Sequence, residues 1–550
     1  MKKILKTMLL LAAISSGTGM FVSCSDDDNL TTADALFRPV INEDDNIELG
    51  LDDNNVPYMI VTWDNYTDAN EYTVKVETVD GTGTQEITTS ELTCRFDNLE
   101  YDKEYFVYIS AANTQTGLKS KAFSLTTTTP DFPTHLITPT STDIIDIAAR
   151  ISWSDDDYDE LRILLNSDDT IVDDIELTAE DREAQTYIIT GLEPKTTYKV
   201  EAYKNGVYQG KKRITTAAAE SFSGNVVDLR GVEDTQGWIS TANITELVEQ
   251  YPDQDITVVL EGGSHYKYQS VNFPATTGTI KFITGLSLAG NAVFDCSGEH
   301  NVANDITVGG ITYEKIFFAD VDGNKTSSNY GGHYLFNVNS SGHIGNLTFK
   351  SCQIKYKRGC VRTRSTFVVD QLTYDDCILD SIGGYAIAMA EGTSCITNIK
   401  MVNSTVANCN RTFVNTVSTA GSIDISNSTF VYCTASSRNF DDINNCKEFK
   451  ISNCLFGITG ETPVNVVSES STTTGFRGWA AACNPVPATS DCFFTSDVAW
   501  RLGADGAPAA QFQGTTISTD TKGTFKDPEH SDFTILNTSE LKGIGDPRWY

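Results

Sequence analysis

The feature that most constrains this chain is a repeat of about 25 residues in its C-terminal half. Five segments share one pattern, apolar-x-apolar-x-polar-[Cys/Ser]-x-apolar. They are LTFKSCQI (347–354), LTYDDCIL (372–379), IKMVNSTV (399–406), IDISNSTF (423–430) and FKISNCLF (449–456), which begin 25, 27, 24 and 26 residues apart. A period of this size, with short strands and no helical pattern, predicts a coil of stacked β rungs.

Stacking of this repeat places equivalent residues in columns. One interior column is expected to contain Leu347, Leu372, Ile399, Ile423 and Phe449. A second column, of small buried groups, is expected to contain Cys352, Cys377, Ser404, Ser428 and Cys454. Just before it runs a polar ladder of Ser351, Asp376, Asn403, Asn427 and Asn453. Such a ladder can satisfy backbone groups at a turn in every rung.

The cysteines fit this interpretation. The chain has 13 of them, mostly without the spacing of a metal site. A buried thiol packs as a small apolar group, so we expect the cysteines of the repeat to be free. Cys483 and Cys492 flank a proline-containing loop and are the best disulfide candidates, but the sequence leaves their state open.

The repeat resembles the right-handed parallel β-helix of the pectate-lyase-like superfamily, over residues 221–550. A helix is expected at 243–251, capped by Asn243 with Glu246 three residues later, where it would cover the open end of the first coil. Earlier rungs are expected at 279–290 and 314–323, followed by an insertion at 322–340. The end of the chain, FKDPEHSDFTILNTSELKGIGDPRWY, resembles the closing segment of β-helix lipoproteins from polysaccharide-utilisation systems of Bacteroidetes-type bacteria.

Two earlier segments, 57–128 and 129–219, alternate apolar and polar residues between turn signals, as half-buried strands do. Trp63 and Trp153 lie in early strands of these segments. The second segment also carries an L-x-P-x-T-x-Y-x-V motif, formed by Leu192, Pro194, Thr196, Tyr198 and Val200.

That motif resembles fibronectin type III domains. The resemblance implies that each tryptophan fills a sandwich core and that a tyrosine closes the corner between two strands with its hydroxyl group. In the first segment Tyr105 is the corresponding tyrosine, but Tyr101 and Lys103 replace the usual proline and threonine. The expected fold is therefore all-β: two fibronectin type III-like sandwiches followed by a parallel β-helix.

The N-terminus resembles the signal peptide of a bacterial lipoprotein, with residues 1–23 removed and Cys24 lipidated. Three lysines precede the apolar run MLLLAAI (8–14), which is too short to span a bilayer, and the segment ends in FVSC. The following SDDDN (25–29) resembles an export tag to the outer face of the outer membrane. Residues 24–56 hold ten acidic residues and one basic residue, Arg38, and are expected to form an acidic linker. We therefore expect a lipid-anchored protein on the outer membrane, facing outward.

The chain is strongly acidic, with 74 acidic and 40 basic residues and a formal charge of -34. Phosphate backbones would be repelled, so nucleic acid is not an expected partner. Against this background, KYKRGCVRTR (355–364) gathers five basic residues within ten.

This stretch supplies the candidate binding site for a glycan or another anion. Its members are Lys355, Tyr356, Lys357, Arg358, Arg362 and Arg364, joined by Tyr385 from the next rung. Residues two apart share a strand face, so Arg362 and Arg364 are expected together, as are Lys355 and Lys357. Guanidinium groups pair bidentately with carboxylates such as those of uronic acids.

Other residues were expected near this stretch. Asp375 and Asp380 come from the next rung, and His333 and His343 come from the preceding region. A shift of 25 residues places Arg362 and Arg364 opposite Ile387 and Met389. Either the turn lengths differ, or these apolar residues face outward.

No complete catalytic motif is present. The polygalacturonase-type set of acidic residues and the Arg-x-Pro-x-x-Arg element of pectate lyases are both missing. If the protein is an enzyme, we expect a polysaccharide lyase with Lys357, Arg362 or Arg364 as base or clamp, and either calcium as a cofactor or basic residues would neutralise the uronate carboxylate. Otherwise neither a cofactor nor a metal site is expected.

The sequence thus favours a surface lipoprotein that binds an acidic, pectin-like polysaccharide for glycan utilisation, with an outer-membrane glycan uptake complex as a further partner. An active polysaccharide lyase and an adhesin or structural surface protein are the alternatives. The glycan, the protein partners and the oligomeric state are left open.

Overall fold

The computed structural model describes residues 35–326, 329–415, 419–433, 439–443, 445–458, 476–480, 483–500, 510–536 and 538–550. The expected signal peptide, Cys24 and the acidic tag lie outside these residues. The described fold is all-β, as predicted. None of the described helices has the length and apolar character needed to cross a membrane.

The first module is a β-sandwich. One sheet has the order β1 (Ile47–Leu51), β2 (Pro57–Thr62) and β5 (Thr93–Phe96). The other has the order β4 (Thr84–Thr89), β3 (Glu71–Thr78), β6 (Glu104–Ala112) and β7 (Phe123–Thr128). Trp63 is buried in its core. The hydroxyl group of Tyr105 accepts a hydrogen bond from the backbone N–H of Glu100 at 3.1 Å, so the predicted tyrosine corner is present despite the departures from the motif.

This module begins earlier than the sequence suggested. The linker was expected to extend to Val56, but the short helix α2 (Glu43–Asn46) is followed by β1, which pairs with β2. Ile41 is also buried in the first core. The acidic composition of the expected linker concealed β1, because the few apolar residues of this edge strand stand among carboxylates.

The second module contains a four-stranded antiparallel sheet and a separate strand pair. The sheet has the order β10 (Ile171–Glu176), β9 (Glu160–Leu165), β12 (Thr197–Lys204) and β13 (Val207–Thr215). The pair is β11 (Thr186–Thr190) with β8 (Ala148–Ser152), and α3 (Ala179–Ala184) is a short helix. Trp153 and Tyr198 are buried, as expected of core residues.

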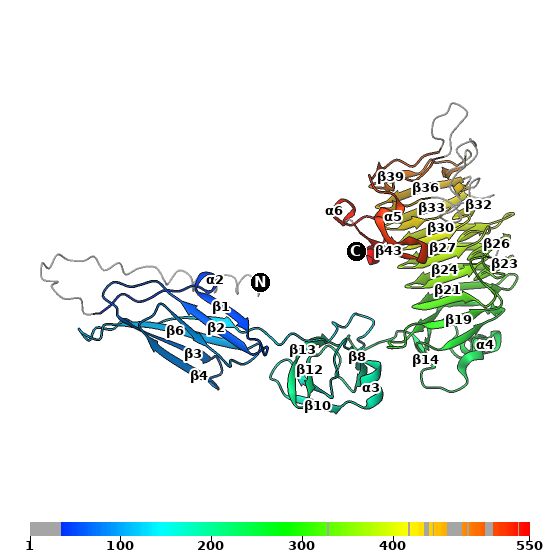
Figure 1. Ribbon diagram of the computed structural model, residues 1–550. Coiled ribbons are helices and arrows are strands. Elements are labelled where there is room, and N and C mark those ends of the chain that lie inside the picture. Colours follow the sequence, from blue (N-terminus) through cyan, green and yellow to red (C-terminus); the bar gives the residue numbers. More distant parts are fainter. Residues whose placement is uncertain are drawn as a thin grey trace, which may run out of the picture. The chain divides into compact units, whose positions relative to one another are not determined.

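The C-terminal body is a parallel β-helix whose described strands form three sheets (Figure 1). Sheet 1 contains β14 (Asn225–Asp228), β15 (Ile256–Leu260), β18 (Thr276–Thr284), β21 (Thr307–Glu314), β24 (His343–Lys350), β27 (Val368–Asp375), β30 (Cys395–Val402), β33 (Thr419–Ser426), β36 (Asn445–Ser452) and β39 (Ala488–Ser490). Sheet 2 contains β16 (His265–Tyr268), β19 (Ala292–Cys296), β22 (Ile316–Asp320), β25 (Gln353–Lys357), β28 (Ile378–Ile382), β31 (Thr405–Cys409), β34 (Thr429–Val431), β37 (Leu455–Phe456), β40 (Phe493–Phe494) and β41 (Thr515–Thr516). Sheet 3 contains β17 (Val271–Phe273), β20 (His300–Val302), β23 (Phe336–Ser340), β26 (Val361–Ser365), β29 (Ala388–Ala390), β32 (Phe413–Asn415), β35 (Asn439–Asp441) and β38 (Arg477–Trp479).

The predicted columns are confirmed by the strand register. In sheet 1, Leu347 pairs with Leu372, which pairs with Ile399, and the column continues through Ile423 to Phe449. All five side chains are buried. Two positions further along the strands, the rings of Phe282, Tyr313, Phe349 and Tyr374 stack nearly parallel, with centroids 5.3–5.4 Å apart.

In five successive coils, the corner between sheets 1 and 2 is formed by the polar ladder. Ser351, Asp376, Asn403, Asn427 and Asn453 all adopt left-handed backbone conformations, with φ between 47° and 56°. Asparagine and aspartate tolerate this region better than most residues because their short side chains bond locally. The buried column that follows is linked across rungs, since the hydroxyl of Ser404 accepts the backbone N–H of Cys377 at 3.0 Å.

The first coil is covered by α4 (Thr241–Gln250), which follows the 3-10 turn η1 (Thr235–Gly237). The helix starts two residues before the predicted one, and its N-cap is Ser240 rather than Asn243. The hydroxyl of Ser240 accepts the N–H of Asn243 at 3.2 Å, so the expected pairing of Asn243 with Glu246 is not the cap. The predicted insertion also ends early, because β23 begins at Phe336.

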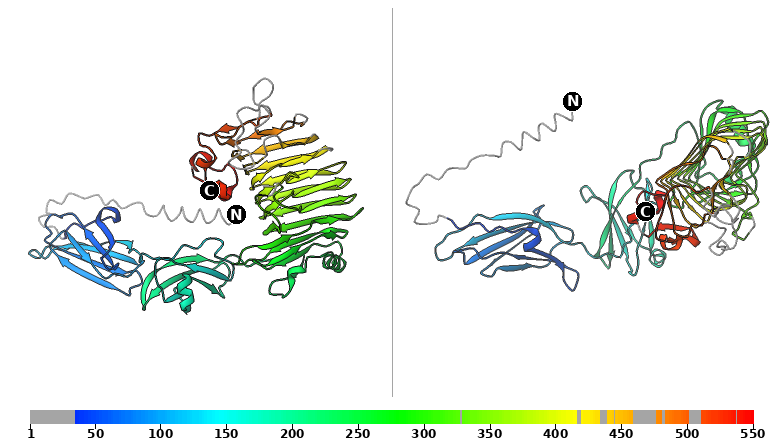
Figure 2. Two further views of the ribbon diagram at one scale, coloured as in Figure 1. Left: turned by 45° about the vertical axis from the view of Figure 1, so that its right-hand side comes forward. Right: turned by 90° about the horizontal axis from the view of Figure 1, so that it is seen from above.

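The closing segment packs along the side of the β-helix rather than across its end (Figures 1 and 2). It contains α5 (Thr521–Thr524), β42 (Phe525–Asp527), η2 (Pro528–His530), β43 (Asp532–Ile535), α6 (Thr538–Leu541) and η3 (Pro547–Trp549). Phe525, Phe533 and Ile535 pack on the outer surface of sheet 2.

Polar side chains of the closing segment fasten it to this sheet. The hydroxyl of Thr405 donates to Asp546 and accepts from the indole N–H of Trp549 at 2.7 Å. Arg548 forms an ion pair with Asp376 of the ladder. The sequence GDPRW (545–549) therefore holds the closing segment against sheet 2.

The described cysteines are all free, including Cys483 and Cys492. The thiol of Cys483 instead donates to the carboxylate of Asp441 at 3.3 Å. Burial raises the pKa of the Cys409 thiol to about 12, so this group stays protonated and packs as a small apolar side chain.

The aromatic stack makes a stability prediction. Phe349→Ala removes a ring from the middle of the stack and leaves a cavity, so we expect the free energy of unfolding to fall by about 3–5 kcal/mol. Thr348→Ala on the outer face of the same strand is the matched control and should change it by about 0.5 kcal/mol or less. Denaturant unfolding followed by circular dichroism measures both, and equal effects would contradict the assigned register.

Candidate functional site

The basic stretch 355–364 does not form one patch. It passes from sheet 2 to sheet 3, and the structure places its side chains in three different environments. Lys355 lies outside sheet 2, Lys357 lies inside the coil, and Arg358, Arg362 and Arg364 lie toward sheet 3.

The charge of Lys355 is neutralised by a carboxylate from the next coil. Its ammonium group lies 3.3 Å from the carboxylate of Asp380, which is buried and also accepts the hydroxyl of Ser531 from the closing segment. The ammonium also lies 5.4 Å from the ring centre of Tyr356. Lys355 and Tyr356 therefore belong to the surface beside the closing segment, apart from the arginines.

Lys357 is fully buried, so a ligand on the surface cannot reach it. The expectation that it shares a face with Lys355 is wrong, because Tyr356 between them has a left-handed conformation with φ 55°. This reversal forms the corner between sheets 2 and 3, and it turns the next residue inward. In the following coils Ile382 and Cys409 occupy the same inward position by strand pairing.

Arg362 and Arg364 point outward from the same strand, β26, as predicted. Arg362 forms the centre of an arginine–tyrosine cluster, which consists of Tyr334, Arg358, Arg362, Tyr385 and Glu391. The ring centre of Tyr385 lies 4.6 Å from the guanidinium carbons of both Arg358 and Arg362. Tyr334 is almost fully buried beneath them, with its ring 5.6 Å from that of Tyr385.

The two outer arginines differ from Arg362 in their charge balance. Arg362 forms an ion pair of 2.7 Å with Glu391 and donates to the hydroxyl of Tyr334 at 3.3 Å. Among the described residues, neither Arg358 nor Arg364 has a carboxylate within ion-pair distance. Their Nε–H groups are buried and have no hydrogen-bond partner there. Within the described residues, the guanidinium group of Arg358 donates a hydrogen bond from Nη2 to the hydroxyl of Tyr385 at 3.2 Å.

The electrostatics of the cluster suit an anionic ligand. Burial raises the pKa of Tyr334, and the charges of Arg362 and Arg358 oppose that rise. Guanidinium groups stay protonated in proteins, so the cluster presents fixed positive charge beside aromatic rings. Such a surface can bind a carboxylate or sulfate and stack on a sugar ring.

Of the other residues expected beside the stretch, two lie elsewhere. Asp375 pairs with Lys350 in sheet 1, and His343 contacts Asp370 at 2.9 Å. His333 does lie beside the stretch, because its backbone carbonyl accepts the N–H of Arg358 at 3.0 Å and its ring contacts the buried carboxylate of Asp320 at 3.0 Å. The register of β26 against β29 also differs from the assumed shift of 25 residues, because Arg362 pairs with Met389, which lies 27 residues later. Met389 does face outward, in a small apolar cluster with Ala386 and Val414.

Sequence reasoning missed Tyr334 and Glu391. Tyr334 lies at the end of the irregular connection from sheet 2 to sheet 3, and Glu391 lies in the connection from sheet 3 to sheet 1, where the repeat pattern gives no register. The interior position of Lys357 could have been predicted from the spacing of the sequence. Lys357, Ile382, Cys409 and Cys433 are spaced like the second column, from Cys352 to Ser428.

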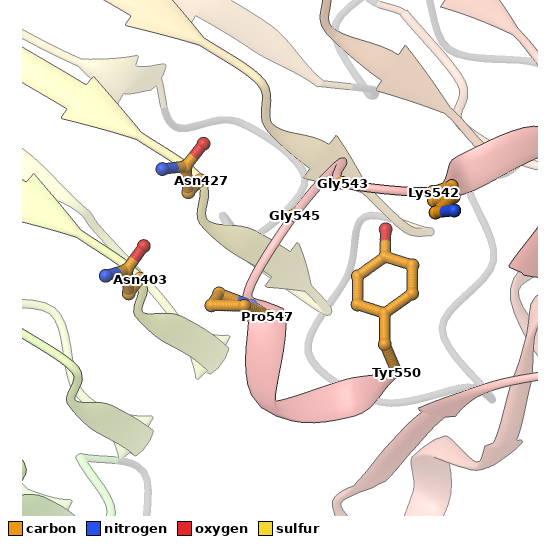
Figure 3. Close-up of a pocket in the computed structure, with 7 residues that line it drawn as sticks. All are labelled: Asn403, Asn427, Lys542, Gly543, Gly545, Pro547 and Tyr550. Atoms are coloured by element: carbon orange, nitrogen blue, oxygen red, sulfur yellow. The ribbon is translucent and has the colours of Figure 1, made fainter. Parts of the chain in front are cut away.

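A hollow with a volume of about 800 Å³ lies between the polar ladder and the closing segment (Figure 3). It is lined by Asn403, Asn427, Lys542, Gly543, Gly545, Pro547 and Tyr550. Lys542 is the one charged residue of this lining, so the hollow lacks the paired groups that acid–base chemistry needs. Within the described residues, no three histidine, cysteine or acidic side chains are grouped to hold a metal ion.

The most perturbed carboxyl group on sheet 3 is that of Asp441. Burial raises its pKa to about 7. Its oxygens accept the N–H of Ile443 at 2.8 Å and the thiol of Cys483. Because Asp441 is fully buried, it cannot contact a polysaccharide, and we interpret it as a structural group.

Comparisons with known proteins cover parts of the chain. The profile of a family described as a domain of unknown function (DUF5123) matches residues 423–549. Among solved structures, the FN1–FN3 domains of chicken CNTN1 are similar at 15% identity and a TM-score of 0.15, over 34% of this chain and 69% of that chain. A segment of two fibronectin type III domains from chicken tenascin is similar at 16% identity and a TM-score of 0.16, over 31% of this chain and 100% of that chain. A comparison with curated proteins gave no match.

The raised pKa of Asp441 predicts a pH dependence of stability. A folded-state pKa of about 7, above the ordinary 3.8, means that the folded protein holds this proton more tightly than the unfolded chain. The contribution of Asp441 to stability is therefore present below about pH 4 and is lost as the pH rises to about 7, by up to about 4 kcal/mol.

Asp441→Asn should remove this pH dependence. Between about pH 4 and pH 7 the unfolding temperature of the variant should therefore rise relative to that of the wild type. Glu448→Gln, at an exposed ion pair with Lys450, is the control and should follow the wild type. Parallel curves for the wild type and Asp441→Asn would show that the carboxyl group is not perturbed by burial.

Proposed function

We propose that this protein binds an acidic polysaccharide of the pectin type through the arginine–tyrosine cluster and Arg364, on sheet 3 of its β-helix. One observation carries the proposal. In a chain with 74 acidic residues, Arg358 and Arg364 have no carboxylate partner among the described residues, while Arg358 contacts the ring of Tyr385. A uronate carboxylate would supply the missing partner, and the ring would pack against the sugar.

The shape of the scaffold supports a linear ligand. Neighbouring strands of a sheet are about 4.8 Å apart, so a β-helix repeats its surface at nearly constant spacing along the axis. Arg411, two coils after Arg358 near the same sheet, is already paired with Asp442 at 3.1 Å. A chain of uronic acids that follows the axis would therefore be held by Arg358 and Arg364 on one coil and extend over the neighbouring coils.

The geometry favours binding over lyase chemistry. A lyase needs a base that can reach the proton beside the uronate carboxylate. Lys357 is buried, Arg362 is paired with Glu391, and guanidinium groups resist deprotonation. The cluster can therefore neutralise an acid, but it offers no base among the residues first considered for catalysis.

The cellular setting proposed with this function rests on sequence resemblance. The signal-like N-terminus ending at Cys24 and the acidic tag support a lipoprotein on the outer face of an outer membrane in Bacteroidetes-type bacteria. The repeat supports a place in the pectate-lyase-like superfamily. In that setting the sandwiches act as spacers or as contacts to a glycan uptake complex.

The proposal predicts retardation in native gels that contain polygalacturonate but not in gels that contain neutral dextran. The double variant Arg358→Ala/Arg364→Ala should bind about a hundredfold more weakly or worse, because each of the two lost charge-assisted contacts costs about 1.5–3 kcal/mol. Binding of the wild type should also weaken with added salt.

Arg162→Ala is the matched control. Arg162 lies 4.6 Å from the ring of Tyr203 in the second module, but it is paired with Glu160 and Asp174. Its removal should leave retardation unchanged. Equal retardation of the double variant and the wild type would refute the site, and ultraviolet-absorbing unsaturated products from the same mixtures would support a lyase instead.

A further inference from the structure

The interior of the β-helix contains a charged pair that glycan binding does not use. The side chains of Lys357 and Asp320 are both fully buried, and Nζ of Lys357 lies 3.7 Å from Oδ2 of Asp320. Within the described part of the chain, this Nζ has no hydrogen-bond partner. A buried ammonium group with unmet hydrogen bonds is costly, so the pair requires an explanation.

The groups around Lys357 give its charge no other counterion. Burial and the nearby charge of Lys357 hold the pKa of His300 well below its ordinary value. Burial raises the pKa of Cys296 to about 11, although Lys357 opposes the rise. Both groups are therefore neutral near pH 7, and His300 is stacked on Tyr268 with ring centroids 3.7 Å apart. Among the described residues, Asp320 is therefore the one carboxylate within ion-pair distance of Lys357.

The carboxyl group of Asp320 is arranged for attack at its carbon atom. Oδ2 accepts the backbone N–H of His333 at 2.8 Å, and Oδ1 accepts the backbone N–H of Asp322 at 3.1 Å. Donors on both oxygens stabilise the negative charge that forms when a nucleophile adds to the carbon. Nδ1 of His333 lies 3.0 Å from Oδ2, and its ring is partly exposed, so it can move protons between the site and solvent.

We propose that Lys357 and Asp320 join in an intramolecular amide (isopeptide) bond. A proton moves from the ammonium group to the carboxylate, which leaves a neutral amine beside a carboxylic acid. The amine lone pair then adds to Cγ of Asp320 and forms the C–N bond. His333 transfers a proton from the nitrogen to the hydroxyl group, the C–O bond breaks, and water leaves. One amide and one water replace the ammonium–carboxylate pair, and no oxidant is needed.

The environment favours this condensation. Fixed proximity replaces a bimolecular encounter, and the dry interior removes the water that would reverse the reaction. The product also removes two buried charges. The bond would join the ends of β22 and β25, which are paired neighbours in sheet 2. It would close the irregular connection around Gly331, where an added Cβ would lie 2.0 Å from the carbonyl oxygen of Tyr356.

Peptide mapping tests the bond directly. Trypsin cleaves after Lys315, Lys325, Lys355 and Arg358, and it does not cleave after a lysine whose amine is acylated. Digestion of the purified full chain should therefore yield peptide 316–325 linked to peptide 356–358, with the sum of their masses less one water. Tandem mass spectrometry should locate the branch at Asp320 and Lys357. Lys357→Met is the control, and its digest should lack this species.

The contrary outcome is equally clear. Free peptide 316–325 at full yield, together with cleavage after Lys357, would overturn the proposal and leave a plain buried ion pair. Loss of water confined to peptide 316–325 would do the same, since a cyclic imide at Asp322–Gly323 has that mass. Because the decisive reading comes from the wild type, it does not depend on whether a variant folds.

Discussion

The parallel stacking of equivalent residues, with a left-handed residue at successive corners between sheets 1 and 2, is the constraint on which the rest of the β-helix depends. Between sheets 1 and 2 the corner residue runs from Lys315 through Ser351 and the asparagines to Asp491, always with positive φ. A corner of this kind reverses the inward and outward alternation at a fixed place in every coil. It therefore decides which side chains form the core and which reach the surface, and the buried columns follow from it.

This constraint explains both the successes and the failures of prediction from sequence. The column from Leu347 to Phe449 was predictable because one period of side chains repeats in register. The position of Lys357 was mispredicted because simple alternation was extended across the second corner, at Tyr356. Tyr334 and Glu391 could not be predicted, since irregular connections carry them and no repeat sets their register. The strand Ile47–Leu51 was hidden by the acidic residues around it.

Two chemical roles follow this corner within ten residues. Directly after it, Lys357 points into the interior, where Asp320 is the one carboxylate within ion-pair distance among the described residues. Further along, Arg358 and Arg364 reach the surface of an acidic protein without carboxylate partners in the described structure. A cluster of basic residues in sequence thus becomes one interior group and one surface group. The surface group carries the proposed function. It presents local positive charge on a chain whose overall negative charge repels anions.

The central claim is that sheet 3 recognises uronate carboxylates through Arg358 and Arg364. The most direct test is a crystal structure of the protein soaked with an oligogalacturonate. The account predicts ligand carboxylate oxygens within hydrogen-bond distance, about 2.7–2.9 Å, of both guanidinium groups, with a sugar ring against Tyr385. A ligand bound only in the hollow beside Tyr550, or on another sheet, would contradict it.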